Sequence, residues 1–225
     1  MGVSKTMNVI SFDLDGTLTT PAFVDAVWRV GIPQHYAAQR AISMEKAREY
    51  IFSLYDAMGD HDLNWYDLPF WLAYLKLAVS PEQLLADFRH LIALYPDVLP
   101  VLASLQGCYK LIIISNANRL FLDLEVSATG IGRFFNRIFS VTSDFGRVKR
   151  EEDIYQQVCA HLGIPPAEIL HVGDHREFDF DAPRRVGMHA YLIDRSRHES
   201  APHVIHSLDE LVKIISIESL PEFYL

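Results

Sequence analysis

The sequence predicts an α/β fold, a three-layer sandwich with a parallel sheet, together with a small all-α segment. Two observations predict it. Short apolar runs typical of buried strands alternate with helical stretches in the second half of the chain, which indicates a parallel sheet covered on both faces. The residues between the first and second of these runs carry helical periodicity and no strand pattern.

The first strand is expected at about residues 8–13, followed by helices from Pro21 to about Tyr95. Within this block, residues 35–58 carry apolar positions at helical spacing as far as Gly59, a residue that commonly ends helices. The motif SPEQ at 80–83 is typical of a helix start, with a Ser cap and Pro in the first turn.

Strands and helices alternate after this block. Helices are expected at 100–106, at 151–162 and from the capping motif SLDE at 207–210. The remaining apolar runs predict strands at 110–115, 137–140, 169–173 and 189–193, the last of the sheet. The predicted division is therefore a sheet-containing core of residues 1–18 and 96–225 and a helical domain of residues 19–95.

Composition and charge argue against two classes of protein, those that bind nucleic acid and those that span a membrane. The 225 residues are half hydrophobic and carry a formal net charge of -9. Without a basic patch the chain is not expected to bind nucleic acid, and no apolar run is long enough to predict a membrane span. Cys108 and Cys159 stand outside any CxxC spacing and are expected to be buried free thiols, which suits a cytoplasmic protein.

Polar side chains follow the strands at the edge where ligands bind in open parallel sheets. They are Asp13 and Asp15, Ser115 and Asn116, Lys149 ahead of a helix, and Asp174 and Asp179. Converging acids repel one another unless a cation lies between them, and Mg²⁺ prefers carboxylate oxygens together with phosphate and water. A metal, an anion site and a free carboxylate together predict phosphoryl transfer through an aspartyl intermediate.

Four motifs carry a resemblance to a known family: DLDGT at 13–17, IIISN at 112–116, Lys149, and HVGDHREFD at 171–179. In this order they resemble the haloacid dehalogenase-like (HAD) superfamily of hydrolases. The resemblance implies a Rossmann-like catalytic core, and it implies that residues 19–95 are the helical cap inserted after the first motif. Because Asp15 stands two residues after Asp13, the resemblance is to the phosphatases and not to the dehalogenases.

The resemblance also implies a role for each residue. Asp13 would be the nucleophile that forms an aspartyl phosphate, and Asp15 the general acid and then the base. Ser115 would bind a phosphoryl oxygen beside the backbone amides near Leu14, Asp15 and Asn116.

The resemblance also implies which residues bind the phosphate charge and which bind the metal ion. Lys149 would neutralise the intermediate and bind the phosphate, with Arg147 and Arg150 as nearby rival cations. Mg²⁺ would be held by the carboxylates of Asp13 and Asp174 and by the carbonyl of Asp15. Asp179 would lie behind these ligands, holding metal-bound water or Lys149.

The function predicted on this basis is Mg²⁺-dependent hydrolysis of a small phosphorylated metabolite, with the oligomeric state left open. The alternatives are a phosphomutase, a phosphonate hydrolase that would use a cap lysine (Lys46 or Lys76), and a non-catalytic Mg²⁺-dependent binding or switch protein. A cap suits a small substrate because it closes over the site and excludes water.

Aromatic residues are concentrated in the helical block. It contains all three tryptophans, Trp28, Trp65 and Trp71, and also Tyr66, Phe70 and Tyr74. Most are expected to form the core of the helical bundle, and one or two to face the site.

Overall fold

The computed structural model describes residues 7–150 and 152–218. Its centre is a six-stranded sheet in the order β3-β2-β1-β4-β5-β6, and every neighbouring pair is parallel. The strands are β1 (Val9–Phe12), β2 (Lys110–Ser115), β3 (Arg137–Ser140), β4 (Ile169–Gly173), β5 (His189–Ile193) and β6 (Val204–Ile205). The predicted α/β class and the parallel sheet are confirmed.

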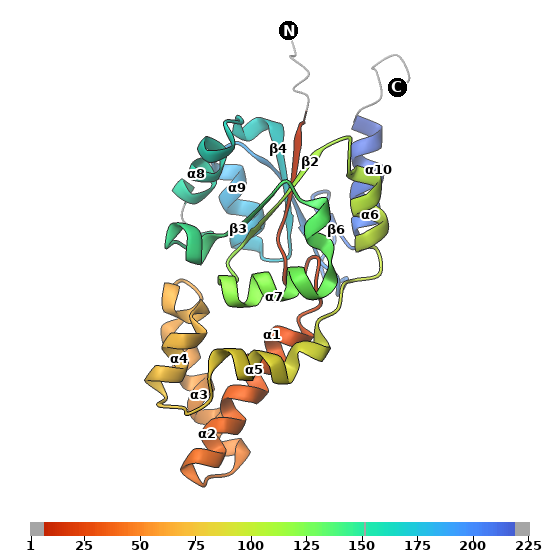
Figure 1. The fold of residues 1–225 in the computed structure, drawn as a ribbon. Helices are drawn as coiled ribbons and strands as arrows, with labels where there is room; N and C mark the ends of the chain where they lie inside the picture. The colour runs from red at the N-terminus through yellow and green to blue at the C-terminus, as the bar shows by residue number, and fades with distance from the viewer. Residues whose placement is uncertain (1–6, 151, 219–225) are drawn as a thin grey trace.

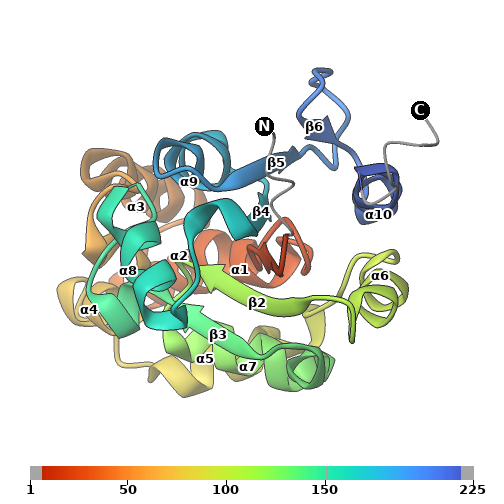
Figure 2. The ribbon, with the colours of Figure 1, turned by 90° about the horizontal axis from the view of Figure 1, so that it is seen from above.

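Helices cover both faces of the sheet (Figures 1 and 2). On one face lie α6 (Val98–Leu105), α7 (Arg119–Thr129) and α10 (Leu208–Glu218), packed on Ile10, Phe12 and their apolar neighbours. On the other lie α8 (Glu152–Leu162) and α9 (Ala182–Arg185), packed on Val9, Ile112 and Ile114. Residues of β1 and β2 therefore enter both cores, which is why these strands consist mainly of apolar residues.

The helices between β1 and α6 form a second body below the sheet in Figure 1, here called the helical segment. Its elements are α1 (Ala22–Ala26), a π-helical turn at Val27–Gly31, α2 (Ile32–Arg40), α3 (Met44–Met58), the 3-10 turn η2 (Leu63–Tyr66), α4 (Leu68–Tyr74), α5 (Pro81–Phe88) and a 3-10 turn at Arg89–Leu91. The segment has an apolar core of its own, which includes Phe23, Ile51 and Trp71, and Phe121 of α7 packs into the same cluster.

Three local expectations need correction. Residues 35–58 are two helices and not one, because Ala41 adopts a left-handed conformation (φ 53°) and Ser43 then caps α3 through the backbone N–H of Lys46. The strand at 189–193 is not the last, since β6 pairs with it. Cys108 is exposed in the turn before β2, whereas Cys159 is buried as expected.

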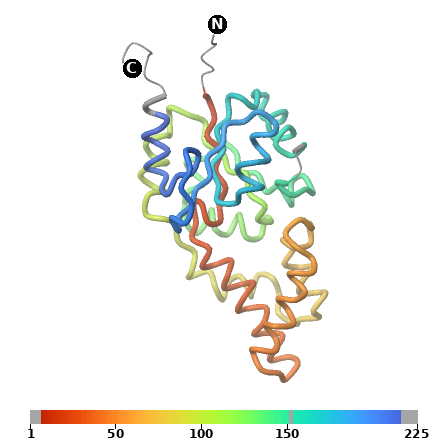
Figure 3. Tube along the Cα trace, turned by 180° about the vertical axis from the view of Figure 1, so that it is seen from behind, coloured from red at the N-terminus to blue at the C-terminus, as the bar shows by residue number. Residues whose placement is uncertain are grey.

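The chain crosses between the sheet and the helical segment twice, and the two crossings run side by side (Figure 3). The N–H of Thr20 donates to the carbonyl of Ala93 at 2.9 Å, and that of Tyr95 donates to Leu18 at 3.0 Å. The chain therefore enters and leaves the helical segment at one place, close to the end of β1. Among the described residues, no helix is both long and apolar enough to cross a membrane.

Candidate active site

The strand order places the candidate site. β1 lies between β2 and β4, so the chain winds in one direction from β1 to β3 and in the other from β4 onward. In open parallel sheets, ligands bind beyond the carboxyl ends of the strands at this reversal. Asp13 follows β1 there and Asp174 follows β4, with the N–H of Asp13 still donating to Val172 of β4 at 2.8 Å.

Lys149 is the cation at the centre of the site. Its Nζ lies 2.5 Å from Oδ1 of Asp13 and 2.6 Å from Oδ1 of Asp179, and it also donates to the carbonyl of Ile114 at 3.3 Å. All three charged side chains are buried. By contrast, Arg147 and Arg150 are exposed, and Arg150 pairs with Glu177. Of the three predicted cations, Lys149 is thus the buried one, and it contacts Asp13.

Asp179 is held from behind by a fully buried histidine. His171 Nε2 lies 3.0 Å from Oδ1 of Asp179, and Nδ1 lies 2.8 Å from the hydroxyl of Ser11. The backbone N–H of His175 donates to the other oxygen of Asp179. The result is a continuous chain of polar contacts from Ser11 through His171, Asp179 and Lys149 to Asp13.

The buried charges shift one another's pKa values. Burial works against the ammonium of Lys149, but Asp13 and Asp179 outweigh it and raise the pKa of that lysine well above its ordinary value. Burial also opposes ionisation of Asp179, but Lys149 and His171 outweigh that effect and lower its pKa. Burial raises the pKa of Asp13, the charge of Lys149 offsets part of the rise, and Asp179 adds to it.

Asp15 lies in the tight loop that follows Asp13. The carbonyl of Leu14 accepts the N–H groups of Leu18 and Thr19, and Thr19 Oγ1 lies 3.4 Å from Oδ1 of Asp15. Desolvation raises the pKa of Asp15 well above its ordinary value, and the neighbouring carboxyl of Glu125 adds to this. This shift favours the protonated carboxyl, the form that a general acid needs, over the carboxylate.

Two glycines make room for the acids at the strand ends. Gly16 has a φ of 76°, and a Cβ on it would overlap the carboxylate of Asp174. A Cβ on Gly173 would overlap the side chain of Asp179. Both acids therefore pack against bare backbone. Asp174 is itself exposed, and local desolvation together with Asp13 and Asp179 raises its pKa.

The β2–α7 loop carries the expected phosphate-binding residues. Ser115 and Asn116 are buried, and Oδ1 of Asn116 accepts the backbone N–H of Lys149 at 2.9 Å. The amide nitrogen of Asn116 donates to the hydroxyl of Tyr66 in η2, and that of Asn118 donates to the carbonyl of Tyr66 at 2.7 Å. This loop is thus held both by the Lys149 backbone and by the helical segment.

Among the residues that the structure describes, one group of carboxylates is spaced to hold a metal ion. It consists of Asp13, Asp174 and Asp179, which each offer an oxygen within 4.8 Å of the others. Both oxygens of Asp179 already accept hydrogen bonds, which leaves Asp13 and Asp174 as the better donors. Carboxylate oxygens are ligands that Mg²⁺ prefers.

The structure brings together the residues predicted from four separate parts of the sequence: the Asp13 loop, the Ser115 loop, Lys149, and the Asp174 loop with Asp179. Sequence reasoning assigned no role at the site to Ser11, His171 or Glu125, and it named Tyr66 only among the aromatic residues of which one or two would face the site. A histidine within an otherwise apolar strand was the signal for His171, since buried polar groups need partners. Tyr66 carried no comparable signal, because its contact depends on how η2 docks on the core.

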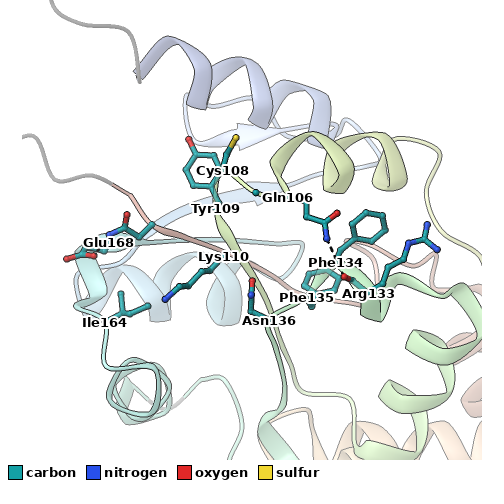
Figure 4. A pocket seen from close by; sticks show the side chains of 12 residues that line it. Gln106, Cys108, Tyr109, Lys110, Arg133, Phe134, Phe135, Asn136, Ile164 and Glu168 are labelled. Atoms are coloured by element: carbon teal, nitrogen blue, oxygen red, sulfur yellow. Dashed lines mark hydrogen bonds between the residues drawn. The ribbon is translucent and has the colours of Figure 1, made fainter.

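One surface hollow is remote from these acids. It has a volume of about 570 Å³ and lies at the opposite ends of the strands, where Lys110 begins β2 and Glu168 precedes β4 (Figure 4). Asp15 instead lines two other hollows, one of about 560 Å³ beside Asp174 and one of about 170 Å³ beside Asn118.

Comparison with known proteins gives the same family as the motifs. Residues 7–187 match the model of haloacid dehalogenase-like hydrolases. The GMP/IMP nucleotidase YrfG of Escherichia coli is 26% identical over 183 residues, covering 81% of this chain and 80% of its own. A HAD phosphatase from Thermococcus onnurineus superposes with a TM-score of 0.83 at 29% identity, covering 93% of this chain and 98% of that one. The glyceraldehyde 3-phosphate phosphatase of Methanopyrus kandleri is 27% identical over 106 residues, 47% of this chain and 45% of its own.

Proposed function

The chain belongs to the haloacid dehalogenase-like hydrolases, and on that premise we propose that it is a Mg²⁺-dependent phosphatase of small phosphate monoesters. The observation that carries the proposal is the pair Asp13 and Asp15, in which Asp13 contacts Lys149 and Asp15 has a raised pKa. These features support Asp13 as the nucleophile and Asp15 as the proton donor. The similarity to proteins named nucleotidase and phosphatase supports the same activity.

In the first step a carboxylate oxygen of Asp13 attacks phosphorus, the phosphorus–oxygen bond to the ester group breaks, and Asp15 protonates the departing oxygen. In the second step water attacks phosphorus while Asp15 takes a proton from it. The bond between Asp13 and phosphorus then breaks and releases phosphate. Lys149 holds Asp13 in place, and its positive charge offsets the negative charge of the phosphoryl group.

The proposed metal ligands are the carboxylates of Asp13 and Asp174 and the carbonyl of Asp15. The oxygen-only donor set and the crowding of Asp13, Asp174 and Asp179 fit Mg²⁺. When bound, Mg²⁺ supplies charge neutralisation for the acids and for the phosphoryl oxygens. Ser115 and the loop amides near Leu14 and Asn116 complete the proposed phosphate site.

The helical segment, within residues 19–95, is proposed to act as the cap. The side-chain amides of Asn116 and Asn118 in the β2–α7 loop donate hydrogen bonds to Tyr66, which holds the segment against the proposed phosphate site. The phosphonate hydrolase alternative is less favoured because Lys46 and Lys76, the lysines of the segment, are both exposed. The free thiols Cys108 and Cys159 support placing the enzyme in the reducing cytoplasm.

The test is phosphate release from a panel of phosphorylated metabolites with Mg²⁺, comparing the wild type with Asp13→Asn. We expect the variant to lose activity by about a thousandfold or more, because the nucleophile is gone. Asp123→Asn, an exposed acid on α7 that pairs with Arg119, is the matched control and should retain activity. A wild type that hydrolyses no member of the panel, or an Asp13→Asn variant as active as the wild type, contradicts the proposal.

A further inference from the structure

One cavity between the helical segment and the core opens beside the proposed proton donor. It has a volume of about 170 Å³ and is here called the ring cavity. Its wall consists of Asp15 together with Val24, Trp28, Trp65, Tyr66, Asn118 and Phe121. Because Asp15 must reach the oxygen that leaves phosphorus, a cavity that Asp15 lines beside the phosphate loop is positioned to hold the departing group.

The chemistry of the ring cavity is aromatic and nearly uncharged. Among the lining residues that the structure describes, Asp15 is the sole ionisable acid or base apart from the phenol of Tyr66, whose pKa burial raises further. No lysine or arginine is among the described lining residues of the ring cavity. A departing group that carries a second phosphate would therefore lose its hydration there without an ion pair to replace it. A flat, uncharged group suits this wall, since it can stack on the rings.

The rings are already held in place. Trp28 stacks on Phe121 of α7 with ring centroids 5.7 Å apart and an angle of 12°. Trp65 lies 6.4 Å from Trp28. Trp28 and Trp65 are half-buried, in contrast to Trp71, which is 1% exposed in the core of the segment. Side chains fixed before binding cost little entropy when a ligand stacks on them.

A second cavity adjoins the first. It has a volume of about 280 Å³, and Val24, Trp28 and Trp65 line both spaces. Asp25, Arg29 and Asp56 also line it, and Asp25 pairs with Arg29 at 3.0 Å. The two carboxylates would accept hydrogen bonds from amino or ring N–H groups.

The hollow on the Asp174 side is the rival location for the departing group. It is more polar and contains Arg176 and Arg195. Both arginines already have acidic partners, because Arg176 pairs with Glu199 and Arg195 with Asp97 at 2.6 Å. The ring cavity, in contrast, adjoins Asn118 in the phosphate loop itself.

We propose that the ring cavity binds the departing group of the substrate and selects a planar, uncharged aromatic ring, so that the substrates are monophosphates whose departing group carries such a ring. This inference rests on the proposed phosphatase function and adds the substrate class to it. Aryl phosphates and nucleoside monophosphates share the ring. The second cavity favours the larger nucleoside, whose base would extend toward Asp25 and Asp56.

The first test compares substrates that differ only in the departing group. We expect kcat/KM for phenyl phosphate and guanosine 5′-monophosphate to exceed that for ribose 5-phosphate by about tenfold, the size of one stacking contact. Guanosine 5′-diphosphate should be hydrolysed poorly, because its departing group is charged. A higher kcat/KM for guanosine 5′-monophosphate than for phenyl phosphate would show that the second cavity binds the base. The reverse order would restrict the site to small aryl groups and would overturn the role of the second cavity.

The second test uses variants. Trp65→Leu should raise KM for the aromatic substrates about tenfold and leave KM for ribose 5-phosphate and acetyl phosphate within about twofold, and Trp65→Phe should restore most of the loss. Tyr74→Leu, which removes a 55% exposed ring on α4, is the control. Arg176→Gln tests the rival hollow.

The inference is overturned if substrates with and without an aromatic ring react equally well, or if Arg176→Gln and not Trp65→Leu raises KM for the aromatic ones. It is also overturned if Trp65→Leu weakens every substrate alike. In each case hydrolysis of acetyl phosphate by the wild type leaves the phosphatase function standing. If the wild type hydrolyses no phosphate, the function and the substrate class fail together.

Discussion

At the scale of the residue, His171 links the sheet to the charged centre. Its ring is fully buried, with Nε2 toward Asp179 and Nδ1 toward Ser11. Tyr155, which also lies near Nε2, donates its own hydroxyl to the carbonyl of Phe178 at 2.6 Å. Because the hydroxyl proton of Tyr155 is bonded to Phe178, it is not available to His171 Nε2. Nε2 therefore carries its own proton and donates it to Asp179, and Asp179 in turn contacts Lys149.

We therefore expect His171→Gln and His171→Asn to differ. The glutamine amide can place a donor near the position of Nε2, whereas the asparagine amide reaches only the position of Nδ1. His171→Asn should lower kcat/KM about tenfold or more, as loss of a partner behind a reactive group commonly does, and His171→Gln should recover much of it. Steady-state kinetics, with melting temperatures of both variants measured alongside, would decide; equal losses in the two variants would count against the orienting role.

Glu125 is the other buried acid near the site. It is 0% exposed on α7, and burial raises its pKa to about 7. The folded state therefore keeps this proton at pH values where the unfolded chain, near its ordinary 4.5, has lost it. The stability gained in this way is present below about pH 4.5 and is lost as the pH rises through about 7.

Glu125→Gln removes this dependence. At pH 8.5 the variant should be more stable than the wild type by up to about 3 kcal/mol, and at pH 5 the difference should be much smaller. Urea unfolding at the two pH values measures it, with the exposed Glu49→Gln on α3 as control. A stability difference that is the same at both pH values would contradict the shifted pKa.

At the scale of the element, η2 is the part of the helical segment that contacts the phosphate loop. Tyr66→Phe keeps the ring and the hydrogen bond from Asn118, but it removes the hydroxyl, which accepts from Asn116 in the loop and donates to the carbonyl of Asp60 within the segment at 2.9 Å. Of these two lost bonds, the one with Asn116 connects η2 to the loop. Loss of one such bond costs about 1 kcal/mol, so kcat/KM should fall about fivefold. The matched variant Tyr50→Phe alters an exposed hydroxyl on α3 and should leave kinetics unchanged; the same rate for Tyr66→Phe would show that this contact does not matter.

The elements also show what can be predicted from sequence. Strands β2 to β5 match the expected residues because each is a short apolar run between turn residues, a signal contained within a few positions. The break between α2 and α3 was missed because Ala41 has no chemical feature that marks a left-handed residue. The two-residue strand β6 is too short to carry a pattern, and it forms only because β5 offers an edge.

The same distinction applies to the site. Asp13, Asp15 and Asp174 were predictable because each follows a strand that local pattern reveals. The contacts of His171, Glu125 and Tyr66 were not, because they join segments that are distant in the sequence and depend on the packing of α7, α8 and η2. The sequence predicted that most of these aromatic residues would form the segment core and that a few would face the site. It did not predict that Trp71 would be in the core and that Trp28 and Trp65 would line the cavity.

At the scale of the whole molecule, the proposed function assigns the chemistry and the selection of substrate to separate bodies. The reactive acids and Lys149 lie on loops of the parallel sheet, and most rings of the ring cavity come from the helical segment. Phe121 of α7 is the exception, since it belongs to the core helix but packs in the cluster of the segment. It fixes the segment against the same helix that carries Glu125.

The paired crossings at Thr20 and Ala93 have an evolutionary consequence. Because the chain leaves and re-enters the core at hydrogen-bonded neighbours, a different stretch of any length could replace residues 21–92 without moving a strand. Recombination at this one junction would replace the segment that is proposed to select the departing group. The loops proposed to carry out phosphoryl transfer would remain unchanged. The junction also adjoins the loop that carries Asp15, so any newly acquired module would begin its evolution already in reach of the proton donor.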